Sequence, residues 1–195
     1  MPRSEQKNKE IRDNTRSRII KEASLYFARN GFGDTKISDL AKYIGIAQGS
    51  IYVYFKSKEE LYDEIRREAG TGEDIKKLKL LVSLPLPYKK KAEMLADSVI
   101  KALKEDPDFP VRITLSTQLI LENGSSVYDT ELYKNTIKLI NQGRKEGTAP
   151  AVDPKSVTDM FWGMVYVYSL RSLFTEELRL PSKKDLLRLL IKDEG

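Results

Sequence analysis

The stretch ISDLAKYIGIAQGSIYVYFKSK, residues 37–58, decides the fold of the N-terminal part of this chain. It holds two short helical patterns separated by a turn at Gly45, and a further helix opens at Lys58. Apolar side chains can form a seam between the first two helices; they are Leu40, Ala41, Ile44 and Ile51. The pattern predicts a helix-turn-helix followed by another helix.

The outer face of the second helix keeps small, polar and aromatic side chains: Gln48, Gly49, Ser50, Tyr52 and Tyr54. A helix of this kind fits the major groove of DNA. Gln48 can make a bidentate contact to adenine or donate to guanine, so it is the best candidate for reading bases. Gly49 allows close approach of the backbone, Ser50 can reach a phosphate or a base edge, and Val53 suits a thymine methyl group.

The positive charge of the chain lies almost entirely in its first part. Residues 1–58 contain 12 Lys and Arg against 6 Asp and Glu, whereas residues 59–195 contain 22 against 23. The net charges are therefore +6 and −1. This asymmetry is typical of a DNA-binding end joined to a body with another role. Lys58, at the start of a helix, is expected to hold a phosphate there, and Arg16 and Arg18 are further candidates for contacts with DNA.

The chain has neither cysteine nor histidine. Disulfides, thiolate or imidazole zinc sites, cysteine nucleophiles and histidine bases are therefore excluded. The body shows no paired carboxylates at a useful spacing, so we expect no catalytic site, metal or cofactor. Its longest nearly unbroken apolar run, Met160 to Leu170, is shorter than the ~20 residues that span a bilayer. With no signal-peptide pattern either, we expect a cytoplasmic protein with no membrane partner.

Helical periodicity without strand-like alternation predicts an all-α protein. Residues 1–14 are expected to form a flexible basic arm, residues 15–58 a helix-turn-helix domain, and residues 59–195 a helical body. The sequence Ala69-Gly70-Thr71-Gly72 interrupts a helix and is the best candidate for a boundary or hinge between the DNA-binding end and the body. Thr35 or Asp34 is expected to cap the first helix of the helix-turn-helix. In the body, apolar spacing predicts helices near residues 92–105, 109–122, 132–146, 154–175 and 181–190.

The helix that begins at Pro154 is apolar nearly all round. We expect one face to contain Val157, Met160, Phe161, Met164, Val165 and Tyr168, and another to contain Trp162, Tyr166, Leu170 and Leu173. A helix without a polar side must be covered on both faces. One face can pack in its own protomer while the other meets a partner chain or lines a cavity, and Gly163 permits a close helix approach.

The N-terminal segment resembles the TetR family of transcriptional regulators. The matching positions run from Ile19-Ile20, Ala23, Phe27 and Gly31-Phe32, through Asp39-Leu40-Ala41 and the segment Gly45 to Phe55, to the segment Ser57 to Leu61. Lys36 stands where the family usually has Thr or Ser, and Ala47 where it usually has Ser. Lys36 is therefore expected to donate to a phosphate in place of the usual hydroxyl.

The resemblance implies a homodimer with a DNA-binding helix-turn-helix domain and a ligand-binding, dimerising body. It implies that the helices at 127–146 and 154–175 make a four-helix dimer interface. It also implies that Tyr52 and Tyr54 give their hydroxyls to phosphates. The expected function is that of a repressor, released from a palindromic DNA operator by a small, largely apolar effector. The two recognition helices would then lie about 34–36 Å apart.

A cavity for the effector needs a few polar groups in apolar walls. The candidates in the body are Gln118, Glu122, Tyr128, Trp162 and Tyr166, although aromatic residues at helical spacing are more often plain core. One alternative is a DNA-binding architectural or partner-controlled factor without a small-molecule effector. The other, an all-α enzyme that carries a helix-turn-helix, is disfavoured by the missing histidine and cysteine.

Overall fold

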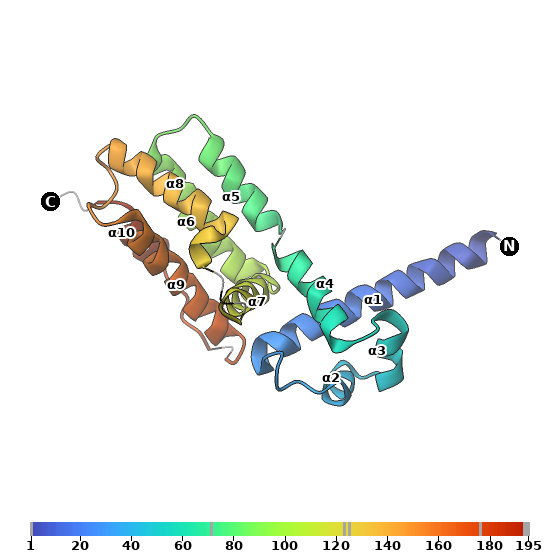
Figure 1. The fold of residues 1–195 in the computed structure, drawn as a ribbon. Helices are drawn as coiled ribbons and strands as arrows, with labels where there is room; N and C mark the ends of the chain where they lie inside the picture. The colour runs from blue at the N-terminus through green and yellow to red at the C-terminus, as the bar shows by residue number, and fades with distance from the viewer. Residues whose placement is uncertain (1, 71, 123, 125, 176, 193–195) are drawn as a thin grey trace. The chain divides into compact units, whose positions relative to one another are not determined.

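The computed structural model describes residues 2–70, 72–122, 124, 126–175 and 177–192. For residues 2–4, 68–70, 119, 121 and 122 it describes the backbone alone. Every regular element in these ranges is helical, which confirms the predicted all-α class (Figure 1). The chain divides into two compact units, Met1–Ala69 and Gly70–Gly195.

The N-terminal unit contains four helices within its described part: α1 (Pro2–Asn30), α2 (Ile37–Ile44), α3 (Gln48–Tyr54) and α4 (Lys58–Gly70). Gly31 ends α1 with φ 77° and Gly45 ends α2 with φ 75°, left-handed conformations that favour glycine. The predicted seam is buried, since Leu40, Ala41, Ile44 and Ile51 are all at most 5% exposed. The helix-turn-helix prediction is therefore confirmed.

Two predicted boundaries are wrong. The flexible arm at residues 1–14 is helical from Pro2 onward, because α1 begins there and continues without a break. Residues 5–14 are all exposed, so no apolar face marked this helical segment in the sequence. The boundary placed after residue 58 falls instead after Ala69, at the glycine-containing break that the sequence offered as the candidate boundary or hinge. Leu61, Tyr62 and Ile65 of α4 are buried, so this helix completes the core of the N-terminal unit.

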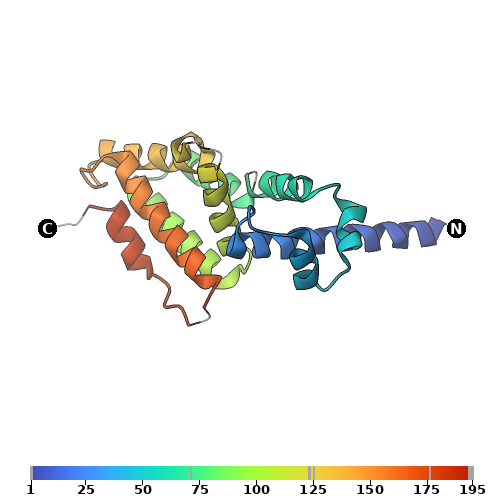
Figure 2. The same cartoon turned by 60° about the horizontal axis from the view of Figure 1, so that its bottom comes forward.

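The C-terminal unit is a bundle of helices: α5 (Glu73–Ser83), α6 (Tyr88–Glu105), α7 (Phe109–Glu122), the 3-10 helix η1 (Val127–Asp129), α8 (Glu131–Lys145), α9 (Pro154–Ser172) and α10 (Lys183–Leu190). α7 packs on α9, α8 packs on α5 and α9, and α10 packs on α6 and α9. Figure 2 shows α9 and α10 running side by side. The helix expected at 127–146 is interrupted at Thr130, whose side chain caps α8 by accepting from the Tyr133 N–H.

Tyr88 lies at the centre of the packing of the C-terminal unit. Its side chain is fully buried, and its hydroxyl donates to the carbonyl oxygen of Leu190. Burial raises the pKa of this phenol well above its ordinary value. The ring lies directly against Gly143 of α8, where an added Cβ would come within 2.5 Å of it. The absence of a side chain at Gly143 therefore lets α8 approach α6 closely at this point.

α9 begins as predicted, with the Asp153 side chain accepting from the Ser156 N–H and Pro154 in the first turn. The two expected faces are drawn incorrectly, because Met160 is 45% exposed whereas Val157, Phe161, Trp162 and Val165 are buried together. The uncovered face carries Met160, Gly163 and Val167 instead. Helical spacing could not assign these residues to the correct face, because nearly every position of α9 is apolar. Within the described ranges, no helix has the length and apolar character needed to cross a membrane.

Candidate nucleic-acid interface

A groove of about 530 Å³ lies where the starts of α2, α3 and α4 meet in the N-terminal unit. α2 and the turn before it provide Thr35 to Ser38, α3 provides Gln48 and Tyr52, and the turn into α4 provides Lys56 to Glu59. The lining includes three lysines and one carboxylate. The Glu59 backbone N–H and then the Ser57 hydroxyl hold the pKa of the Glu59 carboxyl below its ordinary value. The groove therefore has a net positive charge.

The starts of α2 and α3 are not capped by side chains. Their cap residues, Lys36 and Ala47, provide no side-chain hydrogen bond to the helix. The cap predicted at Thr35 is wrong, because its hydroxyl donates to the carbonyl oxygen of Gly31 at 2.6 Å. Free N–H groups at a helix start attract phosphate oxygens. The two departures from the usual family sequence, at Lys36 and Ala47, coincide with these uncapped ends.

The outer face of α3 is open to an incoming ligand. Gln48 and Gly49 are exposed, and an added Cβ at Gly49 would meet no atom within 4 Å. Tyr52 and Val53 are 47% and 64% exposed. Ser50 and Tyr54 are half-buried at the edges of this face. Phe55 is 2% exposed and belongs to the core of the N-terminal unit.

Lys58 has an internal role that the sequence did not reveal. Its ammonium donates to the carbonyl oxygens of Phe32 and Thr35 at 2.9 Å each and of Gly33 at 3.4 Å. It also lies 4.3 Å from the centre of the Phe32 ring, which stacks on Tyr62. Lys58 thus ties the loop before α2 to the start of α4. A contact between Lys58 and a phosphate stays a prediction. The phosphate would have to bind the same ammonium that already donates to the carbonyl oxygens of the loop.

Arg16 and Arg18 are also engaged within the unit. Arg16 pairs with Glu64 at 3.2 Å and lies over the Phe55 ring, and Arg18 donates to the carbonyl oxygen of Ile44 at 2.7 Å. Sequence reasoning missed Lys56, an exposed lysine in the wall of the groove. Lys56 could have been found from the sequence by its position next to Ser57, the residue before α4.

Two of the five residues proposed for an effector cavity, Trp162 and Tyr128, direct the polar groups of their side chains to residues outside that set. Trp162 donates its Nε1–H to Thr136 at 2.9 Å inside the core, and the Tyr128 hydroxyl donates to Asp159 at 2.5 Å. Tyr166 is half-buried against the core. Gln118 is half-buried on α7 and has an interaction of its own. The side chain of Glu122 lies outside the described residues.

Two other polar groups of the C-terminal unit lack partners. Among the described buried side chains, the hydroxyls of Thr114 on α7 and Ser169 on α9 form no hydrogen bond. Both residues are completely buried, and α7 packs on α9. A buried hydroxyl without a partner costs free energy. Neither group was singled out from the sequence, because a single Thr or Ser on a helix has no distinctive pattern.

The sequence model of the family described as "Bacterial regulatory proteins, tetR family" matches residues 19–65, the part that builds the groove. YerO of Bacillus subtilis (strain 168), an uncharacterized HTH-type transcriptional regulator, is 29% identical over 180 residues, which cover 87% of this chain and 60% of YerO. The fatty acid metabolism regulator protein of the same organism is 40% identical over 50 residues, 26% of each chain.

Solved structures extend the likeness of fold to most of the chain. PfmR, a TetR family regulator from Thermus thermophilus, superposes with a TM-score of 0.61 at 19% identity, covering 88% of this chain and 94% of PfmR. A gamma-butyrolactone receptor, an ArpA-like protein, gives a TM-score of 0.60 at 18% identity, covering 83% of this chain and 85% of the receptor. Two further uncharacterized HTH-type transcriptional regulators of Bacillus subtilis (strain 168), YdgC and YfiR, also match. The matches to YdgC, YfiR and YerO span 26%, 34% and 60% of the lengths of those relatives.

Proposed function

We propose that this chain, which belongs to the TetR family of transcriptional regulators, represses transcription by binding a palindromic DNA operator as a homodimer. The observation that carries the proposal is the groove at the starts of α2, α3 and α4, with its uncapped helix ends and net positive charge. Helix N–H groups and lysines bind the phosphates. The exposed face of α3 then enters the major groove.

Within this proposal the residues of α3 other than the buried Ile51 have separate tasks. Gln48 reads a base edge, Val53 contacts a thymine methyl group, and Gly49 lets the backbone approach closely. Ser50, Tyr52 and Tyr54 contact phosphates or sugars beside it, and Lys36 and Lys58 add charge on either side. Selecting duplexes from a random library with the full chain tests the proposal. Recovery of a palindromic sequence supports it, and recovery of unrelated sequences with one uniform affinity contradicts it.

Replacing Gln48 with alanine should relax base preference at one position of each half-site. Loss of one bidentate contact costs about 1–3 kcal/mol of discrimination. Fluorescence anisotropy with the selected duplex and its single-base variants measures this. The matched control is Lys56→Ala, which should weaken binding by a similar factor for every duplex and reduce the salt dependence. An unchanged preference profile for Gln48→Ala would mean that this residue reads no base.

The homodimer is proposed to form through the uncovered face of α9. Met160 and Val167 are 45% and 49% exposed on this face, and Gly163 between them has no atom within 4 Å of an added Cβ. An exposed apolar stripe with a flat centre suits a second copy of the same helix. α8 is expected to contribute beside it.

Replacing Val167 with glutamate should dissociate the dimer. The two-fold axis would bury the introduced carboxylate near its copy, and an unpaired buried charge costs several kcal/mol, so the dimer Kd should rise at least about 100-fold. Sedimentation equilibrium measures the change. Leu80→Glu is the control, because Leu80 on α5 is 65% exposed yet lies outside the proposed interface. A variant at Val167 that stayed dimeric at micromolar concentration would place the interface elsewhere.

We propose that the effector is a small, largely apolar molecule bound between helices of the C-terminal unit. The unpartnered hydroxyls of Thr114 and Ser169 support this, because a ligand with one or two polar atoms would satisfy them within apolar surroundings. Its binding would favour a dimer whose recognition helices are too far apart for the operator. A metabolite panel read by thermal stability and operator release tests this, and a partner-controlled regulator would respond to none of them.

A further inference from the structure

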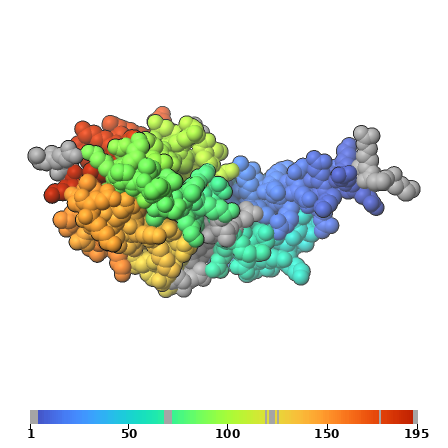
Figure 3. Space-filling model, turned by 90° about the horizontal axis from the view of Figure 1, so that it is seen from above, coloured from blue at the N-terminus to red at the C-terminus, as the bar shows by residue number. Residues whose placement is uncertain are grey.

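A groove of about 430 Å³ in the C-terminal unit, lined by α8 and by Val82 of α5, is lysine-rich. Its lining consists of Val82, Lys134, Ile137, Lys138, Asn141, Gln142 and Lys145, and none of these is a carboxylate. Figure 3 shows the face of the unit on which α5 and α8 lie next to each other. A groove of this volume holds a small molecule.

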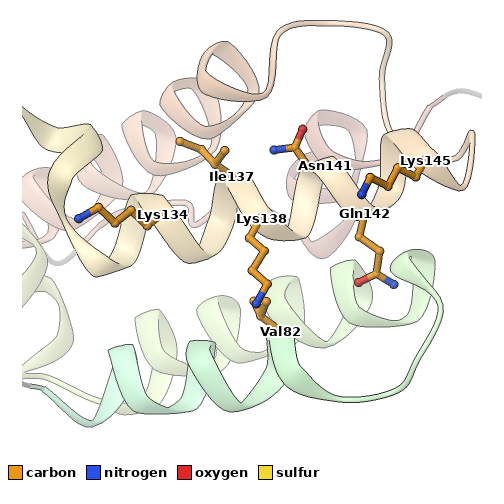
Figure 4. A pocket seen from close by; sticks show the side chains of 7 residues that line it. All are labelled: Val82, Lys134, Ile137, Lys138, Asn141, Gln142 and Lys145. Atoms are coloured by element: carbon orange, nitrogen blue, oxygen red, sulfur yellow. The ribbon is translucent and has the colours of Figure 1, made fainter.

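The three lysines lie on one face of α8. Spacings of four and seven residues separate them by about 6 and 10.5 Å along the helix axis. In Figure 4, Lys138 extends from α8 toward Val82, while Lys134 and Lys145 lie toward opposite ends of the groove. All three are exposed, and none forms an ion pair with another residue that the structure describes. Three positive charges therefore surround the groove without compensation.

At one end of the groove a buried lysine is already held by hydrogen bonds and balanced by a carboxylate. Lys91 is 3% exposed and donates to the Val82 carbonyl oxygen at 2.8 Å and to Gln142 Oε1 at 2.9 Å. Gln142 in turn donates to the Leu86 carbonyl oxygen and to Glu146. The Gln142 amide, then the Tyr88 backbone N–H, and also the charge of Lys91, lower the pKa of the Glu146 carboxyl. Glu146 therefore balances Lys91 and leaves the three exposed lysines unneutralised.

We infer that this groove binds a small molecule carrying two or more phosphate groups, in addition to the apolar effector proposed above. Lysines bind phosphates as point charges, and their spacing along α8 matches groups several ångströms apart on one molecule. Val82 and Ile137 supply apolar surface for the part that joins them. The concave shape and the small volume favour a small molecule over duplex DNA, whose binding needs a long row of phosphate contacts.

Lysine footprinting with inorganic pyrophosphate tests the site on the full chain. Acetylation of Lys134, Lys138 and Lys145 should slow by about tenfold once pyrophosphate reaches roughly ten times its Kd. Lys101 and Lys104 on α6, both exposed, are the internal controls and should react at unchanged rates. The comparison solution contains sodium chloride at the same ionic strength, because general screening would slow all surface lysines alike.

A matched pair of variants tests the same inference by affinity. Lys134→Ala with Lys138→Ala should abolish the pyrophosphate protection of Lys145, while Lys101→Ala with Lys104→Ala removes equal charge and should preserve it. Protection that is absent, or equal at the α6 lysines, would overturn the inference. A groove variant that changed oligomeric state in sedimentation would overturn it too, since the face would then be an interface between copies.

Discussion

Replacing Gly143 with alanine should destabilise the C-terminal unit by about 3 kcal/mol. The new methyl group would lie 2.5–2.6 Å from three ring carbons of Tyr88, which is fully buried and cannot swing away. Displacing α8 instead would disturb the turn after it, because the Gly143 carbonyl oxygen accepts from the N–H groups of Thr148 and Ala149. Either response costs more free energy than the protein gains from the higher helix propensity of alanine over glycine.

The fluorescence of Trp162 measures this effect in the relevant unit. Trp162 is the single tryptophan of the chain and is 7% exposed in the C-terminal core. A loss of about 3 kcal/mol should lower the melting temperature by about 6–12 °C. A double-mutant cycle with Tyr88→Leu is the control, because removing the ring should remove most of the cost of Gly143→Ala. Equal costs in both backgrounds would show that the ring contact is not the cause.

Replacing Lys58 with methionine should weaken both the N-terminal unit and its binding to DNA. The substitution keeps most of the apolar stem but leaves the carbonyl oxygens of Phe32, Gly33 and Thr35 without their donor. We expect a loss of about 2 kcal/mol in unfolding free energy, since hydrogen bonds to a charged group are strong and three acceptors are released. This loss of stability should appear as faster hydrogen exchange of the α2 backbone amides, because the helix would open more often.

Operator binding should fall at least about tenfold in the same variant, because the loop before α2 carries one wall of the groove. Lys56→Met is the matched control: it removes an exposed lysine from the same groove and should weaken DNA binding while leaving amide exchange unchanged. If Lys58→Met behaved like Lys56→Met, with normal stability, a phosphate contact would be its main role. If it lost stability alone, the loop contacts would not matter for DNA.

The residues of α3 show how far the sequence could specify the candidate interface. Of the five residues expected on its outer face, Gln48, Gly49 and Tyr52 are exposed, whereas Ser50 and Tyr54 are half-buried. The lysine and arginine side chains were harder to place. A long charged side chain reaches several possible partners, and Lys58, Arg16 and Arg18 all serve contacts within their own unit. The residues proposed for an effector cavity stay a prediction, and the one tryptophan among them, Trp162, donates to Thr136 in the core.

The lack of cysteine and histidine already argued against an enzyme, and the match of residues 19–65 to the sequence model of a family of bacterial regulatory proteins agrees with it. The α9 helix shows where reasoning from the sequence stopped. Its apolar residues predicted two covered faces, but periodicity could not tell which residues meet the protomer and which remain free. The packing of α7, α8 and α10 on α9 left Met160 and Val167 uncovered.

The sequence by itself determined the helical class, the helix-turn-helix of residues 37–54 and the exposed face of α3. These follow from local spacing, from glycine at left-handed turns and from a match that lies within one short segment. Tertiary structure alone decided the loop role of Lys58 and the lysine groove of α8. Each depends on which side chains distant in sequence become neighbours, and local periodicity holds no information about those partners.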